Sequence, residues 1–293
     1  MKRKMSGASA LGVASQSARE ADPVADKLTD QSYWEGVWRG KDARNWADLV
    51  WVRRRYSWLV LDHLIRERLR PDPGKRVIDV GCGTGRWLVY FNKAFGYSVT
   101  GCDYSETSCA MARRNLQAAR TEGAILKQDF FALTGQYDVL YSAGLIEHFA
   151  DPKSVLEKFV GLLNPSHGVI ISTVPNLSGL SGLYHRLLKR ETFQTHRVVT
   201  VEELRSWYEE IGLKKIEVGA LGSFVPSRFP RDKIRKSHPQ FYRFLWGLFL
   251  RPLTWAANQF CIWLFKRFGL RIESPRFSPY LYAIGETDGR SRC

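Results

Sequence analysis

Three glycines at alternate positions, Gly81, Gly83 and Gly85, follow an apolar segment and could form the turn of a ligand site. Val77 to Arg86 reads VIDVGCGTGR, and glycine permits positive φ and lets a ligand lie against bare backbone N–H groups. A dinucleotide site prefers GxGxxG and a triphosphate P-loop requires a following lysine, so the GxGxG spacing argues against both kinds of site. Asp79 places a carboxylate beside the turn, which favours a ligand with a cationic ammonium or sulfonium.

Two further acidic residues follow the next apolar segments, and each is followed by an aromatic residue. Asp103 is placed to accept hydrogen bonds from a ribose diol, while Tyr104 can pack against a base. Asp129 is suited to accept from an adenine amino group, and Phe130 can cover the face of that base. The complete set expected to bind the cofactor is Asp79, Gly81, Cys82, Gly83, Gly85, Asp103, Tyr104, Asp129, Phe130 and Ser142.

Three histidines and one glutamate are the candidates for proton transfer. His148 leads, because histidine titrates near neutral pH and the end of the fourth strand should face the cofactor. Glu147 could orient His148 or replace it as the base. His196 and His185 are the other candidates. The alternative for His148 is a helix-start residue bonded to backbone, without a catalytic role.

Strands that alternate with helices must bring these residues together. The pattern predicts an α/β Rossmann-like sheet of seven strands, mostly parallel, with an antiparallel last strand. Ser105 is expected to cap one helix, Asp151 with Pro152 to open another, and Thr200 with Glu203 to form a capping box. The strands are expected at 77–80, 98–102, 124–127, 137–142, 168–174, 214–221 and 278–286.

The ordered motifs DVGCGTG, GCDYS, QDFF and YDVLYSAGLIEHF resemble those of the class I S-adenosylmethionine-dependent methyltransferases. This resemblance implies that Asp79 and the glycine turn hold the methionine portion of the cofactor. It also implies that Asp103 holds the ribose and Asp129 the adenine. The pair Glu147-His148 is similar to that of small-molecule O-methyltransferases of quinone biosynthesis.

One position departs from the pattern of that subgroup. Its members can have an acid three residues before the Glu-His pair, forming a proposed metal site, whereas this chain has Gly144. Glu147 and His148 alone do not make a closed metal site, so no metal is expected.

Composition favours a single core with additions. The chain has 293 residues, a formal net charge of +15 and five cysteines without a CxxC pair, which is typical of a reduced intracellular protein. We expect a cytoplasmic protein, with a transit peptide at the N-terminus as a minor alternative. The expected divisions are a disordered tail at 1–29, a helical cap at 30–70, a core at 71–221 and 275–288, and an insertion at 222–274.

The cap and the insertion are both rich in aromatic residues. Tyr33, Trp34 and Trp38 fit a short helix whose rings could close over a sulfonium or simply pack against the sheet. No acid occurs from Lys233 to Ile272, where basic and aromatic residues alternate. Two amphipathic helices broken near Pro252 and lying on a membrane surface are favoured. A lid or dimer contact and a nucleic-acid surface are the alternatives.

These observations predict a methyltransferase that uses S-adenosyl-L-methionine and modifies an oxygen of a hydrophobic or lipid-like small molecule. Its expected partners are that small molecule and an anionic membrane surface, with peripheral attachment to the inner face of the membrane. Nucleic acid is disfavoured as a partner. An RNA methyltransferase and a noncatalytic, cofactor-binding membrane adaptor remain as alternatives.

Overall fold

A seven-stranded sheet organises the chain, as expected from the sequence. The computed structural model describes residues 27–39, 46–188, 193–223, 240, 244, 248–249 and 251–289. The strand order is β3-β2-β1-β4-β5-β7-β6, and β7 runs antiparallel to both β5 and β6. The strands are β1 (Arg76–Val80), β2 (Ser98–Asp103), β3 (Gly123–Lys127), β4 (Val139–Ala143), β5 (Val169–Pro175), β6 (Lys214–Leu221) and β7 (Tyr280–Glu286).

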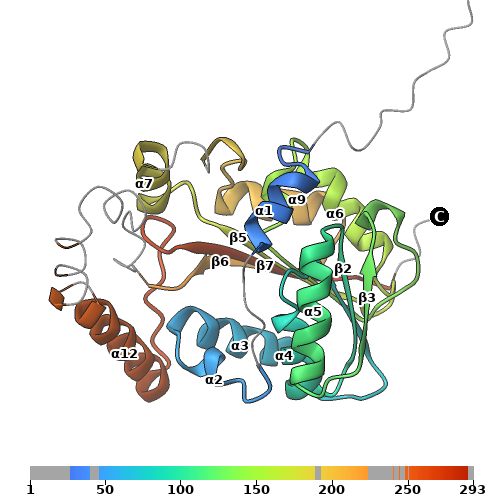
Figure 1. The fold of residues 1–293 in the computed structure, drawn as a ribbon, viewed down its shortest axis with the longest axis horizontal. Coiled ribbons are helices and arrows are strands. Elements are labelled where there is room, and N and C mark those ends of the chain that lie inside the picture. Colours follow the sequence, from blue (N-terminus) through green and yellow to red (C-terminus); the bar gives the residue numbers. More distant parts are fainter. Residues whose placement is uncertain are drawn as a thin grey trace, which may run out of the picture.

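Helices cover both faces of this sheet (Figure 1). One face carries α3 (Tyr56–Arg68) and α4 (Arg86–Phe95), and the other carries α6 (Pro152–Gly161) and α9 (Val201–Glu210). Because both faces are covered, the central strands are apolar on both sides; β5, for example, is buried from Val169 to Val174. The remaining elements include α5 (Glu106–Ala118), which packs beside β2 and β3, and two short 3-10 turns, η2 (Phe130–Ala132) and η3 (Ile146–His148).

The predicted helix starts are confirmed by their capping hydrogen bonds. Ser105 Oγ accepts from the N–H of Ser108 at the start of α5, and the Asp151 side chain accepts from Lys153 at the start of α6. Thr200 and Glu203 form both bonds of a capping box at α9. These caps place the loops that precede the helices at the carboxyl edge of the parallel strands.

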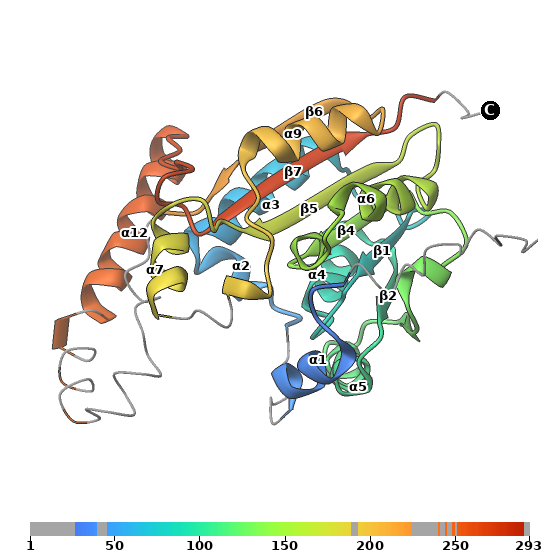
Figure 2. The same ribbon diagram turned by 90° about the horizontal axis from the view of Figure 1, so that it is seen from above.

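The expected aromatic cap consists of three short helices. They are α1 (Gln31–Trp38), α2 (Val50–Arg53) and α3, and α1 confirms the short helix expected for the Tyr33-Trp34-Trp38 segment. Figure 2 shows α1 beside α5, away from α2 and α3. The long segment after β5 contains α7 (Leu180–Leu188).

The insertion between β6 and β7 contributes α12 (Arg251–Phe268), which packs on α3. Asn258 joins the two helices, because its Oδ1 accepts from the Tyr56 N–H at 3.0 Å and its Nδ2 donates to the Arg54 carbonyl at 2.9 Å. Of the two helices expected on either side of Pro252, α12 is the second. Most of the segment before it, including 224–239, lies outside the described residues. No helix in the described ranges is long and apolar enough to cross a membrane.

Candidate active site

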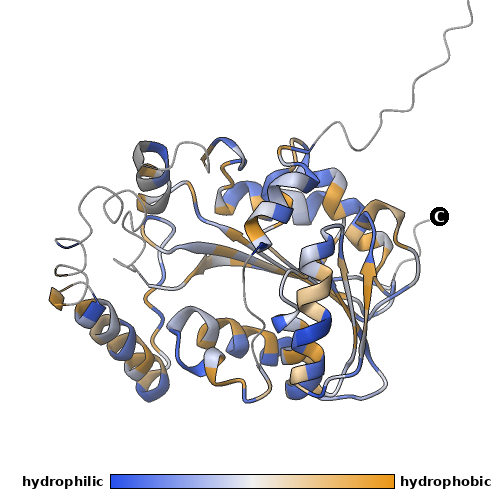
Figure 3. Cartoon of the chain, in the orientation of Figure 1, coloured by the Kyte–Doolittle hydropathy of each residue, from blue (hydrophilic) through white to orange (hydrophobic). Residues whose placement is uncertain are grey.

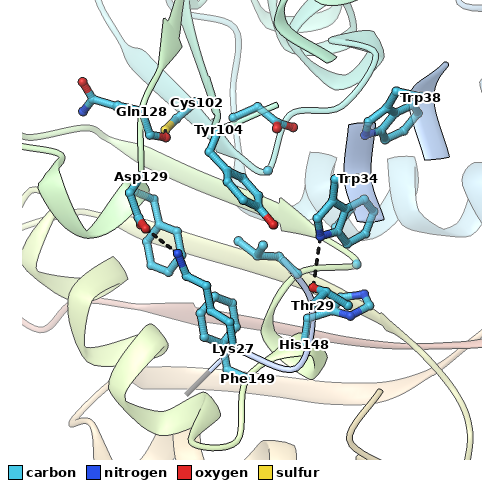
Figure 4. Close-up of a pocket in the computed structure, with 16 residues that line it drawn as sticks. Lys27, Thr29, Trp34, Trp38, Cys102, Tyr104, Gln128, Asp129, His148 and Phe149 are labelled. Carbon is cyan, nitrogen blue, oxygen red and sulfur yellow. Dashed lines mark hydrogen bonds and ion pairs between the residues drawn. The ribbon is translucent and has the colours of Figure 1, made fainter. Parts of the chain in front are cut away.

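A pocket lies at the carboxyl ends of the parallel strands, where the sequence places its acids and glycines. The walls come from the glycine turn after β1, the end of β2, the β3–η2 connection and the β4–η3 segment, and the N-terminal segment covers it (Figure 4). The lining residues are Lys27, Thr29, Trp34, Trp38, Gly81, Cys102, Asp103, Tyr104, Gln128, Asp129, Phe130, Ala143, Gly144, Leu145, His148 and Phe149.

The glycine turn is held open by backbone geometry that side chains would disturb. Gly81, Gly83 and Gly85 have φ values of 74°, 52° and 69°. A Cβ added at Gly83 would lie 2.9 Å from the Trp38 ring, and one added at Gly85 would lie 3.1 Å from the Cβ of Ala112. Gly81 presents bare backbone to the pocket, whereas the absence of a side chain at Gly83 and Gly85 lets Trp38 and α5 pack closely against the turn.

Asp103 lies at the pocket wall, at the end of β2. Its Oδ2 accepts from Ser108 Oγ at 2.7 Å and from the Gly83 N–H at 3.1 Å, and its Oδ1 accepts from the Ser105 N–H at 3.0 Å. Burial raises the pKa of Asp103, and these hydrogen bonds oppose that shift. The carboxylate is thus fixed in place, with lone pairs left on Oδ1 for a ligand hydroxyl.

Asp129 lines the same pocket and forms an ion pair that the sequence does not indicate. Its Oδ2 binds Lys27 Nζ, and the Lys27 ammonium also lies 5.3 Å from the centre of the Tyr104 ring. Figure 4 shows this pair between the wall and the N-terminal segment. Residues 27–29, expected to belong to a disordered tail, are part of the fold instead, because Lys27 forms a β-bridge with Phe149 and Thr29 lines the pocket.

Helix α1 forms the roof of the pocket, and Glu35 fixes it to α5. The Glu35 carboxylate accepts from the Glu106 N–H at 2.7 Å and from the Thr107 N–H at 3.3 Å, at the start of α5. It also accepts from Thr107 Oγ1, and this bond is the main cause that lowers the pKa of Glu35 to about 2. Trp34 Nε1 donates to Thr29 Oγ1 at 3.1 Å within the same roof.

Five of the ten residues expected to bind the cofactor do not line the pocket, namely Asp79, Cys82, Gly83, Gly85 and Ser142. Asp79 is 2% exposed, and burial together with the nearby Asp103 raises its pKa to about 8. Cys82 is buried, and Ser142 Oγ donates to the Val80 carbonyl at 3.1 Å between β4 and β1. Direct contact of these residues with a cofactor stays a prediction.

Glu147, His148 and His196 are brought together beside the pocket. Their ligand atoms lie within 4.8 Å of one another, and the two imidazole rings are 4.2 Å apart. His148 Nδ1 lies 2.8 Å from the Thr195 carbonyl, which assigns the proton to Nδ1 and leaves a lone pair on Nε2. His185, the fourth candidate, lies on α7 and does not line the pocket.

The charges of this cluster are set by burial. Burial, and then the neighbouring His196, lowers the pKa of His148 to about 3, whereas burial raises the pKa of Glu147 to about 8. Both groups are therefore neutral near pH 7. Glu147 is 1% exposed, and among the described residues neither of its side-chain oxygens has a hydrogen-bond partner.

His196 adds a third possible metal ligand to the two, Glu147 and His148, on which the expectation of no metal was based. One carboxyl and two imidazoles are a donor set that suits a divalent transition ion better than magnesium. The expectation of no metal rested on two ligands, Glu147 and His148, and it stays a prediction.

Two pocket residues, Lys27 and Thr29, were missed from the sequence because they belong to the expected tail. Their only sequence signal is a position just before the Asp30 cap of α1, whose side chain accepts from the Tyr33 N–H. The contact between Lys27 and Asp129 spans 102 positions in the chain, and no local pattern reports it.

Comparisons with known proteins agree with this geometry. Residues 51–218 match a family described as a methyltransferase domain. A ubiquinone biosynthesis O-methyltransferase of Pseudomonas aeruginosa is 32% identical over 154 residues, which cover 48% of this chain and 65% of that protein. The enzyme of the same name from Coxiella burnetii is 28% identical over 156 residues, covering 50% and 66%. The matched segment thus spans just under two thirds of each relative.

A solved structure extends the likeness to the fold. Phosphoethanolamine N-methyltransferase 2 of Haemonchus contortus, in complex with S-adenosyl-L-methionine, has a TM-score of 0.51 at 16% identity. The alignment covers 78% of this chain and 52% of that one.

Proposed function

Because this chain belongs to the family of S-adenosylmethionine-dependent methyltransferase domains, we propose that it transfers a methyl group to an oxygen of a hydrophobic or lipid-like small molecule. The observation that supports this function is the placement of Asp103, Asp129 and His148 around one pocket. The Pseudomonas relative is named as an O-methyltransferase, which favours oxygen over nitrogen as the acceptor atom.

S-adenosylmethionine supplies an electrophilic methyl group on a sulfonium sulfur. Asp103 would accept hydrogen bonds from the ribose hydroxyls, and Asp129 would accept from the adenine amino group once Lys27 releases it. Tyr104 and Phe130 offer ring faces to the base. The roof formed by α1 covers the pocket, and correct positioning of donor and acceptor would provide much of the acceleration.

His148 is the proposed base for the acceptor hydroxyl. Its neutral ring holds a proton on Nδ1 through the Thr195 carbonyl, so Nε2 is free to accept another. With a pKa of about 3, the His148 ring alone holds a proton weakly. A second proton-binding group is close, because Glu147 Oε1 lies 3.9 Å from His148 Nε2. Ionisation of Glu147 would favour the protonated imidazole of His148, so we infer that the two side chains share one proton.

The exposed surface of α12 supports an apolar acceptor at a membrane surface. Phe260 and Trp263 stack with ring centres 6.0 Å apart and are 57% and 53% exposed. Figure 3 shows hydrophobic and hydrophilic positions interspersed along α12. The exposed apolar residues of this region are Leu253, Trp255, Phe260, Trp263, Phe268 and Leu270. Its charged residues, Arg251, Lys266 and Arg267, are all basic, which suits anionic lipid headgroups.

A transfer assay tests the reaction. The full chain is incubated with S-adenosylmethionine labelled in the methyl group and with separate lipid and RNA extracts, and the label in each is counted. We expect label in the lipid fraction, released by mild base if it forms an ester. Label in RNA alone would establish the alternative RNA methyltransferase, and no transfer with intact cofactor binding would favour the noncatalytic adaptor.

Vesicle flotation tests the membrane contact separately. We expect the protein to float with vesicles that contain phosphatidylglycerol and to stay behind with phosphatidylcholine alone. Trp263→Asp should abolish flotation, because it places a negative charge on the exposed aromatic face. Gln117→Asp introduces the same charge on an exposed position of α5 and should float like the wild type. Equal flotation of the two variants would exclude α12 as the lipid contact.

A further inference from the structure

Arg86, the first residue of α4, lies among tryptophan rings from three helices. Its guanidinium carbon is 5.3 Å from the ring centre of Trp51 on α2, 4.9 Å from that of Trp58 on α3 and 5.7 Å from that of Trp87 on α4. Trp58 and Trp87 are both buried. The cation is therefore largely removed from water, and the rings replace only part of its hydration.

Among the described residues, no carboxylate forms an ion pair with this cation. Within the described part of the chain, Arg86 has cation–π contacts but no hydrogen bond or ion pair. Arg68, on the same face of the sheet, shows the usual arrangement, since it pairs with Glu217 and Glu286 at 3.2 Å. Asp79 is the nearby acid, but its raised pKa of about 8 leaves it protonated at neutral pH.

Two further features of this place call for an anion. Arg86 stands at the N-terminus of α4, where the helix dipole favours negative charge and disfavours a cation. In addition, the buried indole N–H groups of Trp51 and Trp87 have no hydrogen-bond partner among the described residues. A guanidinium and two indoles offer donors only, so the group that would satisfy them must be an acceptor.

The surroundings also define the character of that group. Trp87 packs on Tyr141 of β4 with ring centres 4.7 Å apart, and Trp58 packs on Tyr280 of β7 at 5.4 Å. These strands lie on the side of β1 opposite β2, away from the nucleoside wall. Aromatic rings around a buried cation suit a ligand with an acidic group on an apolar body.

We propose that Arg86, together with the indole N–H groups of Trp51 and Trp87, binds the carboxylate of a ligand. As an acceptor site this proposal rests on the proposed methyl transfer, because the ligand would then be an apolar carboxylic acid. The methionine carboxylate of the cofactor has the same chemistry and is the other source. Arg86 is a binding residue in either case, since the guanidinium fork matches a carboxylate.

Binding measurements on three variants test the proposal without relying on turnover. Arg86→Met removes the charge and keeps much of the volume, and Arg86→Lys keeps the charge but not the fork. Arg66→Met is the matched control, because Arg66 also lies over a ring, that of Phe95 at 5.1 Å, but already pairs with Asp62. Thermal unfolding checks the fold. Arg86→Met should unfold at or above the wild-type temperature, because an unpaired buried cation is removed.

Calorimetry and tryptophan fluorescence then follow two pairs of probes. The acceptor pair is octanoate and its neutral analogue 1-octanol, and the cofactor pair is S-adenosylhomocysteine and its decarboxylated analogue. We expect Arg86→Met to weaken octanoate binding at least about tenfold, with Arg86→Lys in between and 1-octanol unchanged. A selective loss for S-adenosylhomocysteine over its decarboxylated analogue would instead assign the site to the cofactor carboxylate.

The proposal is overturned if Arg86→Met binds octanoate and S-adenosylhomocysteine as the wild type does, or if Arg66→Met has the same effect. Its failure is distinguishable from that of the proposed function. Carboxylate binding through Arg86 in a protein without methyl transfer would refute only the reaction. Methyl transfer by the protein, together with unchanged affinity of Arg86→Met for both carboxylate probes, would refute only this site.

Discussion

Replacing Glu147 by glutamine should change how the free energy of unfolding depends on pH. The Glu147 side chain is 1% exposed without a hydrogen-bond partner among the described residues, and burial raises its pKa from 4.5 to about 8. A carboxyl whose pKa is raised in the folded state stabilises the protein fully below the unfolded pKa. This stability is lost as the pH rises toward 8, because the folded state must hold a proton that the unfolded state has released.

The size of this effect follows from the two pKa values. Between pH 6.5 and 7.5 the folded state holds about one more proton at Glu147, so the ligand-free protein loses about 1.4 kcal/mol of unfolding free energy from this residue. Asp79, raised from 3.8 to about 8, should contribute a similar loss. Together these two residues should lower the free energy of unfolding by about 2.7 kcal/mol over this unit, and in Glu147→Gln only the Asp79 share, about half of that, should remain.

Urea unfolding followed by tryptophan fluorescence at pH 6.5, 7.0 and 7.5 measures these slopes. Glu202→Gln, at an exposed position of α9, serves as the control and should retain the wild-type slope. If Glu147→Gln and wild type lose the same free energy over this range, Glu147 is ionised in the folded protein. The neutral cluster described for the active site would then be wrong.

Four further outcomes are expected. His148→Gln should reduce the loss of unfolding free energy between pH 6.5 and about 4. The lowered pKa of His148 stabilises the wild type above pH 6.5, and this stability disappears as the pH falls; if urea unfolding shows the same loss in both proteins over this range, the prediction is wrong. Asp103→Asn should weaken S-adenosylhomocysteine binding by about ten- to a hundredfold in calorimetry, and an unchanged affinity would remove its role toward ribose. Lys27→Met should strengthen the same binding by about three- to tenfold, since it frees Asp129, whereas weaker binding would mean that Lys27 closes over the ligand. Mass spectrometry of the purified protein should find less than one equivalent of transition metal, and one equivalent that is lost in His196→Ala would establish the three-residue cluster as a metal site.

The sheet could be predicted from the sequence because the patterns that indicate its strands and helices lie within short segments of the chain. The strand around Val77 and the helix from Arg86 to Phe95 appear at the expected residues, and glycines with positive φ separate them. The capping residues could also be predicted, since a cap is a contact between residues a few positions apart. The same locality places Asp103 at the pocket wall, at the end of a strand beside the glycine turn.

The features that could not be predicted depend on contacts between distant segments. Lys27 reaches Asp129 only because the N-terminal segment crosses the carboxyl edge of the sheet. His196 approaches His148 because the loop before α9 returns to the end of β4, where the Arg197 N–H donates to the Glu147 carbonyl. Arg86 looks like an ordinary helix residue in the sequence, and only the packing of α2, α3 and α4 surrounds it with rings.

The bond between Glu35 and the start of α5 has a consequence for the route by which a ligand enters. If α1 lifted away, the Glu106 and Thr107 N–H groups would lose their acceptor, so α1 and α5 should move together as one body. Beside the pocket, an open groove shares Lys27, Thr29, Tyr104 and Asp129 with it. We therefore expect a nucleoside to enter through this groove, past Lys27, with its adenine end nearest the groove. The contact between Glu35 and α5 would stay intact during entry.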